Sequence, residues 1–476
     1  MEWPKLLSTE SQFKRDSDDE FSQKYEISAF ENDQKAIVSS AAFRRLQDKT
    51  QVFPLDKSDF VRTRLTHSIE VSTISRQLGI MITNNRDKRY SRKEFEDQHT
   101  KDSIISVLSC AGLLHDLGNP PFGHFGEDVI REWFKNEFDK NSFTYGEHII
   151  KEFLTPQMVA DLCNFEGNAQ SLRILSKGHD TNLTYCVLSA LIKYPTDSEN
   201  FFDEDDDVKR HKVGYFAAEK TLFEKIGNTV GTQISEGVYT RHPLAYLMEA
   251  ADDIAYSLSD VEDALKKKKF TLNQFIVYFH ENVEKITDEK NKHYSTMLLK
   301  HLTENLPETR NVENDFIAFQ KWADYARKWF MYTVAFSFSF NYKKIMTGSY
   351  KNELFDDCFH KNSKKILKDI MKLYVYDSSE ILKLELSANK IITSLLNDFI
   401  YAVLYWNPDE NKCSLPIAQQ KLIHLIPENY KNDYRNLHGD NEAENLYLRF
   451  LMVTDYISGM TDSYAKNLYR ELNGID

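Results

Sequence analysis

The sequence predicts a mainly α-helical fold with at most a short β-hairpin. Glycine (16) and proline (11) together make up under 6% of the 476 residues, about half of average usage, so helices are rarely interrupted. Hydrophobic residues account for 41% of the chain, which is enough for a large core. Apolar residues recur at helical spacing, and no series of alternating strands stands out. A hairpin is expected near Val52-Phe53-Pro54 or Tyr215-Phe216.

Three segments can be distinguished along the chain. Residues 1–30 are polar and rich in serine and aspartate, which favours an irregular arm. Residues 31–265 carry the candidate catalytic residues and form the predicted helical core. Residues 266–476 form a second helical lobe, whose function its own residues do not reveal. The length alone favours about three domains.

Two predicted helices in the core direct histidines to the interior. His67 continues an apolar stripe that runs to Leu78, and His115 ends one that starts at Ile104. Each histidine alone is most simply a core residue with satisfied hydrogen bonds. Asp116 follows His115, however, and a buried carboxylate requires a charge partner or a metal. Adjacent side chains point about 100° apart on a helix, so both can turn towards one cation. Mixed nitrogen and oxygen ligands suit Mn, Fe, Ni or Zn better than Ca.

A second histidine–carboxylate pair follows the break at Pro120-Pro121, which ends this helix. His124 and Glu127 meet if Gly126-Glu127 opens a new helix, because they are three residues apart. A histidine oriented by a carboxylate can transfer protons near neutral pH. The alternative is a glutamate favoured by the helix dipole and a histidine in a loop.

A third predicted helix, residues 246–263, has a clean apolar stripe and an acidic opposite face. A solvated acidic face is the simpler interpretation of that pattern. A helical wheel does not choose between Asp252 and Asp253, which flank the face about equally. The polar positions on this face are Glu249, Asp252, Asp253, Tyr256 and Asp260.

These residues lie within longer blocks that carry a family resemblance. The pattern H…HD…D is that of the HD-domain metal-dependent phosphohydrolases, and the blocks resemble the bacterial deoxyguanosine triphosphate triphosphohydrolases (dGTPases). The similarity runs in order over roughly residues 25–470 and implies an HD-domain helical core. The blocks are residues 42–53 (AFRRLQDKTQVF), 64–71 (RLTHSIEV), 165–170 (FEGNAQ), 193–195 (KYP), 249–256 (EAADDIAY) and 459–462 (GMTD).

The resemblance implies a divalent metal, either Mg, Mn or another transition metal. Family members place a tyrosine four residues and an aspartate eight residues after the aspartate ligand, which selects Asp252 over Asp253. Tyr256 would then pack on the deoxyribose and Asp260 would accept a hydrogen bond from its 3′-hydroxyl. The implied metal ligands are His67, His115, Asp116 and Asp252.

The resemblance also places His124 and Glu127 beside the α-phosphate, and it makes Gln47 the candidate for base or sugar contact. Residues 31–76 hold eight lysines and arginines against six acidic residues, in a chain of net charge −13. This local excess suits a triphosphate, and Arg64, one turn before His67, is the best candidate phosphate contact. The alternative for any of the arginines is a surface salt bridge, above all for Arg44 and Arg76. The eight cations are Lys35, Arg44, Arg45, Lys49, Lys57, Arg62, Arg64 and Arg76.

The implied activity is metal-dependent hydrolysis of a dNTP, most simply dGTP, at the α-phosphorus. The products would be the deoxynucleoside and inorganic triphosphate, and the role would be control of the dNTP pool. One alternative is an HD phosphohydrolase acting on a nucleoside monophosphate or cyclic nucleotide. Another is an HD regulator that senses a nucleotide or nucleic acid, although the net charge of −13 disfavours a dedicated DNA binder.

We expect a cytoplasmic protein that does not enter a membrane. Five scattered cysteines without CxxC spacing favour a reducing compartment, and no signal segment or run of about 18 apolar residues is present. By family analogy the second lobe completes the nucleotide pocket and the oligomer contacts. The expected partners are the dNTP substrate, further copies in a hexamer or tetramer, and a nucleotide or single-stranded DNA effector.

Overall fold

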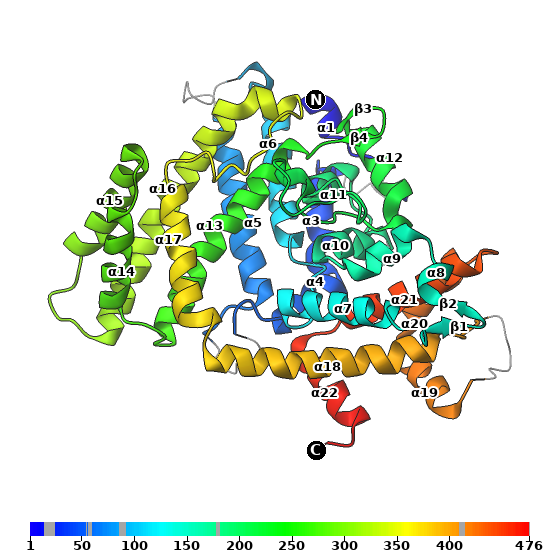
Figure 1. Ribbon diagram of the computed structural model, residues 1–476. Helices are drawn as coiled ribbons and strands as arrows, with labels where there is room; N and C mark the ends of the chain where they lie inside the picture. The colour runs from blue at the N-terminus through cyan, green and yellow to red at the C-terminus, as the bar shows by residue number, and fades with distance from the viewer. Residues whose placement is uncertain are drawn as a thin grey trace.

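The computed structural model describes residues 1–13, 24–53, 55, 60–84, 92–177, 181–408 and 415–475. The described chain is mainly α-helical, which confirms the predicted fold class (Figure 1). Short 3₁₀ turns lie at residues 46–48, 93–95, 208–210 and 217–219, and a π-helical turn spans Lys372–Tyr376. In the described ranges, none of the helices combines the length and the hydropathy that a membrane span requires.

Three helices pack against one another at the centre of the molecule (Figure 1): α5 (Arg64–Ile82), α6 (Gln98–Leu114) and α13 (Pro243–Lys266). Thr63 begins α5 with a capping box, in which its hydroxyl accepts from the Thr66 N–H. Gly112 allows α6 to approach α5 closely, because a Cβ at this position would lie 2.6 Å from Ser72 Cα. This close approach fixes the relative positions of α5 and α6, which position the two predicted histidines.

Further helices surround this centre, and one of them lies in the segment expected to be irregular. Trp3 and Leu6 of α1 are buried, and Trp3 Nε1 donates to the Tyr342 hydroxyl at 2.7 Å. The start of the chain is therefore part of the core, because it supplies two large apolar side chains. The helices are α1 (Trp3–Leu6), α3 (Ala29–Ser39), α4 (Ala41–Arg45), α7 (Gly123–Phe138), α8 (Ile150–Phe153), α9 (Pro156–Cys163), α10 (Gly167–Ser176), α11 (Tyr185–Leu191) and α12 (Lys220–Val230).

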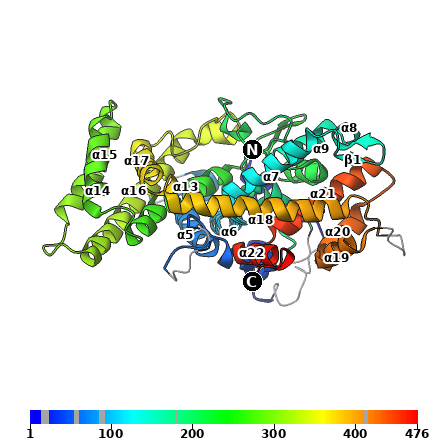
Figure 2. The same cartoon turned by 60° about the horizontal axis from the view of Figure 1, so that its bottom comes forward.

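The C-terminal half consists of helices that return to the first half. Figure 2 shows α14 and α15 projecting at one end, and α18 crossing the molecule. One apolar cluster joins the central helices to α14–α17, and the other joins α7 to α18–α22. Apolar packing therefore crosses the boundary expected at residue 266. The helices are α14 (Leu272–Glu284), α15 (Glu289–Glu304), α16 (Val312–Met346), α17 (Lys361–Met371), α18 (Ser379–Val403), α19 (Ile417–Leu425), α20 (Glu428–Leu437), α21 (Glu442–Ser458) and α22 (Asp462–Leu472).

The described chain holds two short antiparallel strand pairs, and neither lies where the hairpin was expected. They are β1 (Thr144–Tyr145) with β2 (His148–Ile149), and β3 (Gln233–Ser235) with β4 (Val238–Tyr239). Gly146 and Gly237 take positive φ in the two turns, which suits tight hairpins. The expectation at Tyr215-Phe216 was wrong, because the Tyr215 ring stacks on Phe223 in the core at 4.0 Å. Val52 and Phe53 form a bend, and Pro54 lies outside the described residues.

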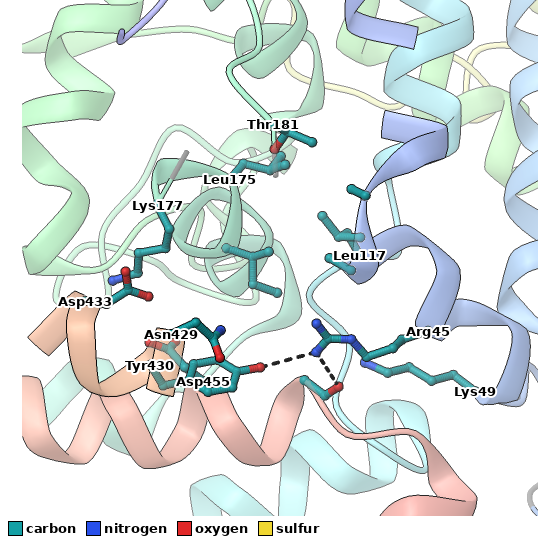
Figure 3. Close-up of a pocket in the computed structure, with 14 residues that line it drawn as sticks. Arg45, Lys49, Leu117, Leu175, Lys177, Thr181, Asn429, Tyr430, Asp433 and Asp455 are labelled. Atoms are coloured by element: carbon teal, nitrogen blue, oxygen red, sulfur yellow. Dashed lines mark hydrogen bonds between the residues drawn. The ribbon is translucent and has the colours of Figure 1, made fainter. Parts of the chain in front are cut away.

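Two cations of the predicted basic stretch attach the C-terminal helices to the core (Figure 3). Arg45 Nη1 donates to the Tyr430 hydroxyl at 3.3 Å and to the Gly459 carbonyl at 3.2 Å. The buried Lys49 donates to the carbonyls of Asn119, at 2.6 Å, and Ser458, at 2.7 Å. Arg45 and Lys49 line a small cavity of about 90 Å³ between these segments. Their positions indicate a structural role.

Candidate active site

The four predicted metal ligands converge from three helices. His67 comes from α5, His115 and Asp116 from the end of α6, and Asp252 from α13. Ligand atoms of the first three residues lie within 4.8 Å of one another. Asp252 Oδ1 lies 3.0 Å from His67 Nε2 and 3.5 Å from His115 Nε2. The fold therefore brings together two imidazoles and two carboxylates that are distant in sequence.

Hydrogen bonding prepares this cluster for a cation. His115 Nδ1 lies 2.8 Å from the Gly112 carbonyl, which can only accept, so Nδ1 carries the proton and Nε2 presents its lone pair. His115 Nε2 lies 3.5 Å from both carboxylates, is buried, and has no hydrogen-bond partner among the described residues. Such an orphaned atom is rare without a ligand. Two imidazoles and two carboxylates fit a divalent transition metal or Mg²⁺.

Nearby cations keep the two carboxylates of the cluster ionised. Burial acts to raise the pKa of Asp252, but the neighbouring His115, Lys193 and His67 hold it well below its usual range. Burial likewise opposes ionisation of Asp116, and the Arg64 guanidinium, whose Nη1 donates to Asp116 Oδ2 at 2.7 Å, lowers that pKa. Both carboxylates are thus ionised and can serve as metal ligands.

Asp253 points away from the cluster. Its carboxylate lies 2.5 Å from Lys364 Nζ of α17 and accepts from the Tyr256 hydroxyl at 2.8 Å. The helical wheel left Asp252 and Asp253 equal, whereas the structure brings only Asp252 to the histidines. Asp260 lies two turns after Asp252, and its buried carboxyl accepts a hydrogen bond from Tyr376.

His124 and Glu127 meet in the first turn of α7, which begins at Gly123, three residues before the expected start. His124 Nδ1 lies 2.9 Å from Glu127 Oε2, and Glu127 Oε1 accepts from the Gly167 N–H at 2.9 Å. Burial acts to raise the pKa of Glu127, but the charge and hydrogen bond of His124, with the charge of Arg131, lower it to about 2. The charge of Glu127 in turn raises the pKa of His124.

A cavity of about 170 Å³ opens beside this pair. Arg64 lines it, and the same guanidinium contacts Asp116, so the cavity adjoins the metal cluster. Gln47 is exposed in the 3₁₀ turn and does not line it, whereas Gln51 does. The lining residues are Thr50, Gln51, Val52, Arg64, Phe122, Gly123, His124, Phe125, Tyr376, Ile381, Leu384, Glu385 and Ala388.

Other cations of the basic stretch lie away from the cavity. Arg62 pairs with Asp263 at 2.5 Å and with Glu262 at 2.7 Å, which is a structural role. Arg44 and Arg76 are exposed, in keeping with the surface alternative. Lys35 is exposed on α3, and Lys57 lies outside the described residues.

Three residues that line the cavity were not predicted from the sequence. Gln51 belongs to the block at residues 42–53, but Gln47 of the same block was chosen instead. Tyr376 and Glu385 come from the second lobe, where the sequence carries no local signal for a site. Only their proximity in the fold assigns them to the cavity.

Comparison with known proteins agrees with this arrangement. Residues 64–175 match the HD domain, and residues 359–471 match the phosphohydrolase-associated domain. A deoxyguanosinetriphosphate triphosphohydrolase-like protein of Listeria innocua is 43% identical over the full length of both chains. Deoxyguanosinetriphosphate triphosphohydrolases of Serratia proteamaculans and Yersinia pseudotuberculosis are 32% and 31% identical over 95% and 94% of each chain. The chain is thus an enzyme of the HD phosphohydrolase class and belongs to the deoxyguanosinetriphosphate triphosphohydrolase family.

Proposed function

We propose that this enzyme hydrolyses deoxynucleoside triphosphates at the α-phosphorus, with dGTP preferred, and so controls the dNTP pool. The products are the deoxynucleoside and inorganic triphosphate. The observation that carries the proposal is the position of Arg64, which contacts Asp116 of the metal cluster and lines one cavity with His124. The names of the Serratia and Yersinia relatives support the choice of substrate.

The metal cluster and its cations would bind the phosphates. A divalent ion held by the two histidines and two aspartates would polarise a phosphoryl oxygen and orient or acidify a water. Arg64 would stabilise negative charge on the triphosphate, since phosphoryl transfer depends mainly on positioning and electrostatics. Lys193 lies 3.6 Å from Asp252 and fixes the orientation of this carboxylate.

His124 would supply the proton for the departing sugar oxygen. Its Nδ1 is bonded to Glu127, so Nε2 is the nitrogen left to face the substrate. The raised pKa of His124 favours the protonated imidazole near neutral pH. Donation from Nε2 to the 5′-oxygen would complete cleavage of the bond between this oxygen and the α-phosphorus.

Tyr256 and Asp260 would contact the deoxyribose, because they follow Asp252 at four-residue spacing on one face of α13. Burial raises the pKa of Asp260 to about 7, so its carboxyl can accept from the 3′-hydroxyl or donate to it. We propose Gln51, in place of Gln47, as the glutamine that contacts the base or sugar, because it lines the cavity.

Product analysis tests this function. The purified protein is incubated with each dNTP and with GTP, in Mg²⁺ and in Mn²⁺, and the phosphate products are separated by ion exchange. We expect triphosphate and deoxynucleoside, with dGTP fastest. His124→Gln should lower the rate by roughly 10²–10⁴-fold, whereas the exposed His148→Gln should not. Orthophosphate or pyrophosphate would refute cleavage at the α-phosphorus, and no turnover even with an added nucleotide or single-stranded DNA would favour a sensing role.

Further parts of the proposal concern the metal, the domains and the assembly. We propose Mg²⁺ or Mn²⁺ as the ion, residues 31–265 as the catalytic core, and residues 266–476 as the lobe that completes the pocket. Tyr376 and Glu385, which line the cavity from this lobe, support the division of roles. We propose a cytoplasmic tetramer or hexamer that responds to a nucleotide or single-stranded DNA. Light scattering, and activity titrations with single-stranded DNA at two salt concentrations, test the assembly and the effector.

A further inference from the structure

His124 lines two cavities. The first is the proposed substrate cavity, and the second has a volume of about 300 Å³. Charged side chains from three segments line this second cavity, among them Arg131 of α7, Glu166 at the start of α10, and Lys212 of the loop before α12. None of these three residues has a role in the proposed hydrolysis.

A chain of ion pairs connects the second cavity to His124. Glu127 bonds His124 through Oε2, and the same oxygen lies 3.7 Å from Arg131 Nη2. Arg131 Nη2 donates to Glu166 Oε2 at 2.6 Å, and Lys212 Nζ lies 3.5 Å from Glu166 Oε1. The Arg131–Glu166 pair, in which Glu166 is buried and Arg131 is half-buried, therefore contacts the same Glu127 oxygen that bonds the imidazole.

Glu166 is itself held in place. Its carboxylate is almost fully buried, and Oε1 accepts from Asn168 Nδ2 at 2.8 Å. Burial and the negative charge of Glu127 raise the pKa of Glu166, while Lys212, Arg131 and His124 lower it. The carboxylates of Glu127 and Glu166 thus share the positive charges of Arg131, Lys212 and the protonated His124.

The charges that face His124 shift its pKa in opposite directions. From its own helix, Glu127 raises the pKa of His124, whereas Arg64 of α5 and Lys212 of the loop lower it. The second cavity also holds the charged or titratable Asp128, Asp203 and His211, and the substrate cavity holds Glu385 and Tyr376 of the second lobe. Glu166 attracts the protonated imidazole, because His124 lowers the pKa of that carboxyl.

We propose that Glu166 and Lys212 are positioning residues that together set the charge state of His124. Glu166 acts through Arg131 and Glu127, whereas Lys212 acts from across the second cavity. This inference rests on the proposed role of His124 as proton donor. Glu166 stabilises the imidazolium and Lys212 opposes it. The pH range of the reaction therefore depends in part on charges outside the substrate cavity.

Two charge-neutralising variants test the proposal, because their effects have opposite signs. Glu166→Gln keeps the shape of the side chain and should shift the fall of kcat at high pH to lower pH, by roughly 0.3–1 unit. Lys212→Met should shift it to higher pH by a similar amount. Lys135→Met is the matched control, because Lys135 is an exposed cation of the same cavity and should leave the profile unchanged. A purely structural role would lower kcat without moving the profile.

An NMR titration of the His124 imidazole in the full-length variants separates this inference from the proposed function. Opposite shifts of the imidazole pKa support the positioning role whatever products the enzyme forms. Opposite shifts without triphosphate among the products would refute the proposed reaction and retain the positioning role. Unchanged values, or shifts of the same sign in folded variants, would overturn the inference even if triphosphate is released.

Discussion

A methyl group added at Gly167 would disturb both the proposed catalytic pair and a proposed metal ligand. Its N–H donates to Glu127 Oε1 at 2.9 Å, which fixes the carboxylate that orients His124. A Cβ at this position would lie 2.5 Å from Glu127 Oε1 and 2.3 Å from Asn119 Oδ1. Asn119 donates to Asp116 Oδ1 at 2.6 Å, so the same methyl group would disturb a proposed metal ligand.

The substitution Gly167→Ala would move both partners by about 1 Å. An ordinary contact begins at about 3.4 Å, so Glu127 Oε1 must retreat by about 0.9 Å and Asn119 Oδ1 by about 1.1 Å. Overpacking of this kind costs about 1–3 kcal/mol of unfolding free energy. Misplacement of a catalytic group by about 1 Å lowers the rate by roughly 10²-fold. We expect a large fall in kcat in a protein that still folds.

The assay is steady-state triphosphate release together with urea unfolding. Gly439→Ala is the matched control, because a Cβ there meets nothing within 4 Å, and it should change neither kcat nor stability. The reasoning is refuted if Gly167→Ala keeps kcat within about twofold of the wild type while folding normally. A large loss of stability with unchanged kcat would show that the contact of Gly167 with Glu127 is structural only.

Three further predictions concern the metal, the pH dependence of stability, and the N-terminal helix. A chelator should abolish turnover, and Asp252→Asn should leave less than one bound metal ion per chain, as measured by metal analysis. Burial lowers the pKa of His242 from 6.5 to about 4, so the unfolded chain binds more protons between these values. The free energy of unfolding should therefore fall by up to about 3 kcal/mol as the pH drops through this range. Urea unfolding should show a smaller fall in the His242→Asn variant than in the wild type. Trp3→Ala should lower the free energy of unfolding by about 3–5 kcal/mol in the same assay. Phe13→Ala, which removes an exposed ring, should leave it nearly unchanged.

The parts of the structure that could be predicted from sequence are those encoded by local periodicity. The apolar stripes at His67 and His115 are regular, so their direction into the core followed from helical spacing alone. Gln47 does not line the cavity, because the chain leaves α4 in a 3₁₀ turn in which this side chain is exposed. Tyr376 and Glu385 reach the cavity only through tertiary packing, which no local pattern records.

The C-terminal segment builds the turn on which the proposed catalytic pair depends. Phe122, directly before α7, takes a left-handed conformation with φ of 64°, which costs on the order of 1–3 kcal/mol for a non-glycine residue. Asp462 offsets this cost, because its carboxylate accepts from the Phe122 N–H at 2.9 Å and from the Thr50 N–H at 3.1 Å. Lys49 adds a second link by binding the carbonyls of Asn119 and Ser458. The orientation of His124 therefore depends on residues more than 300 positions away in sequence, which gives a physical reason for the GMTD block at the far end of the chain.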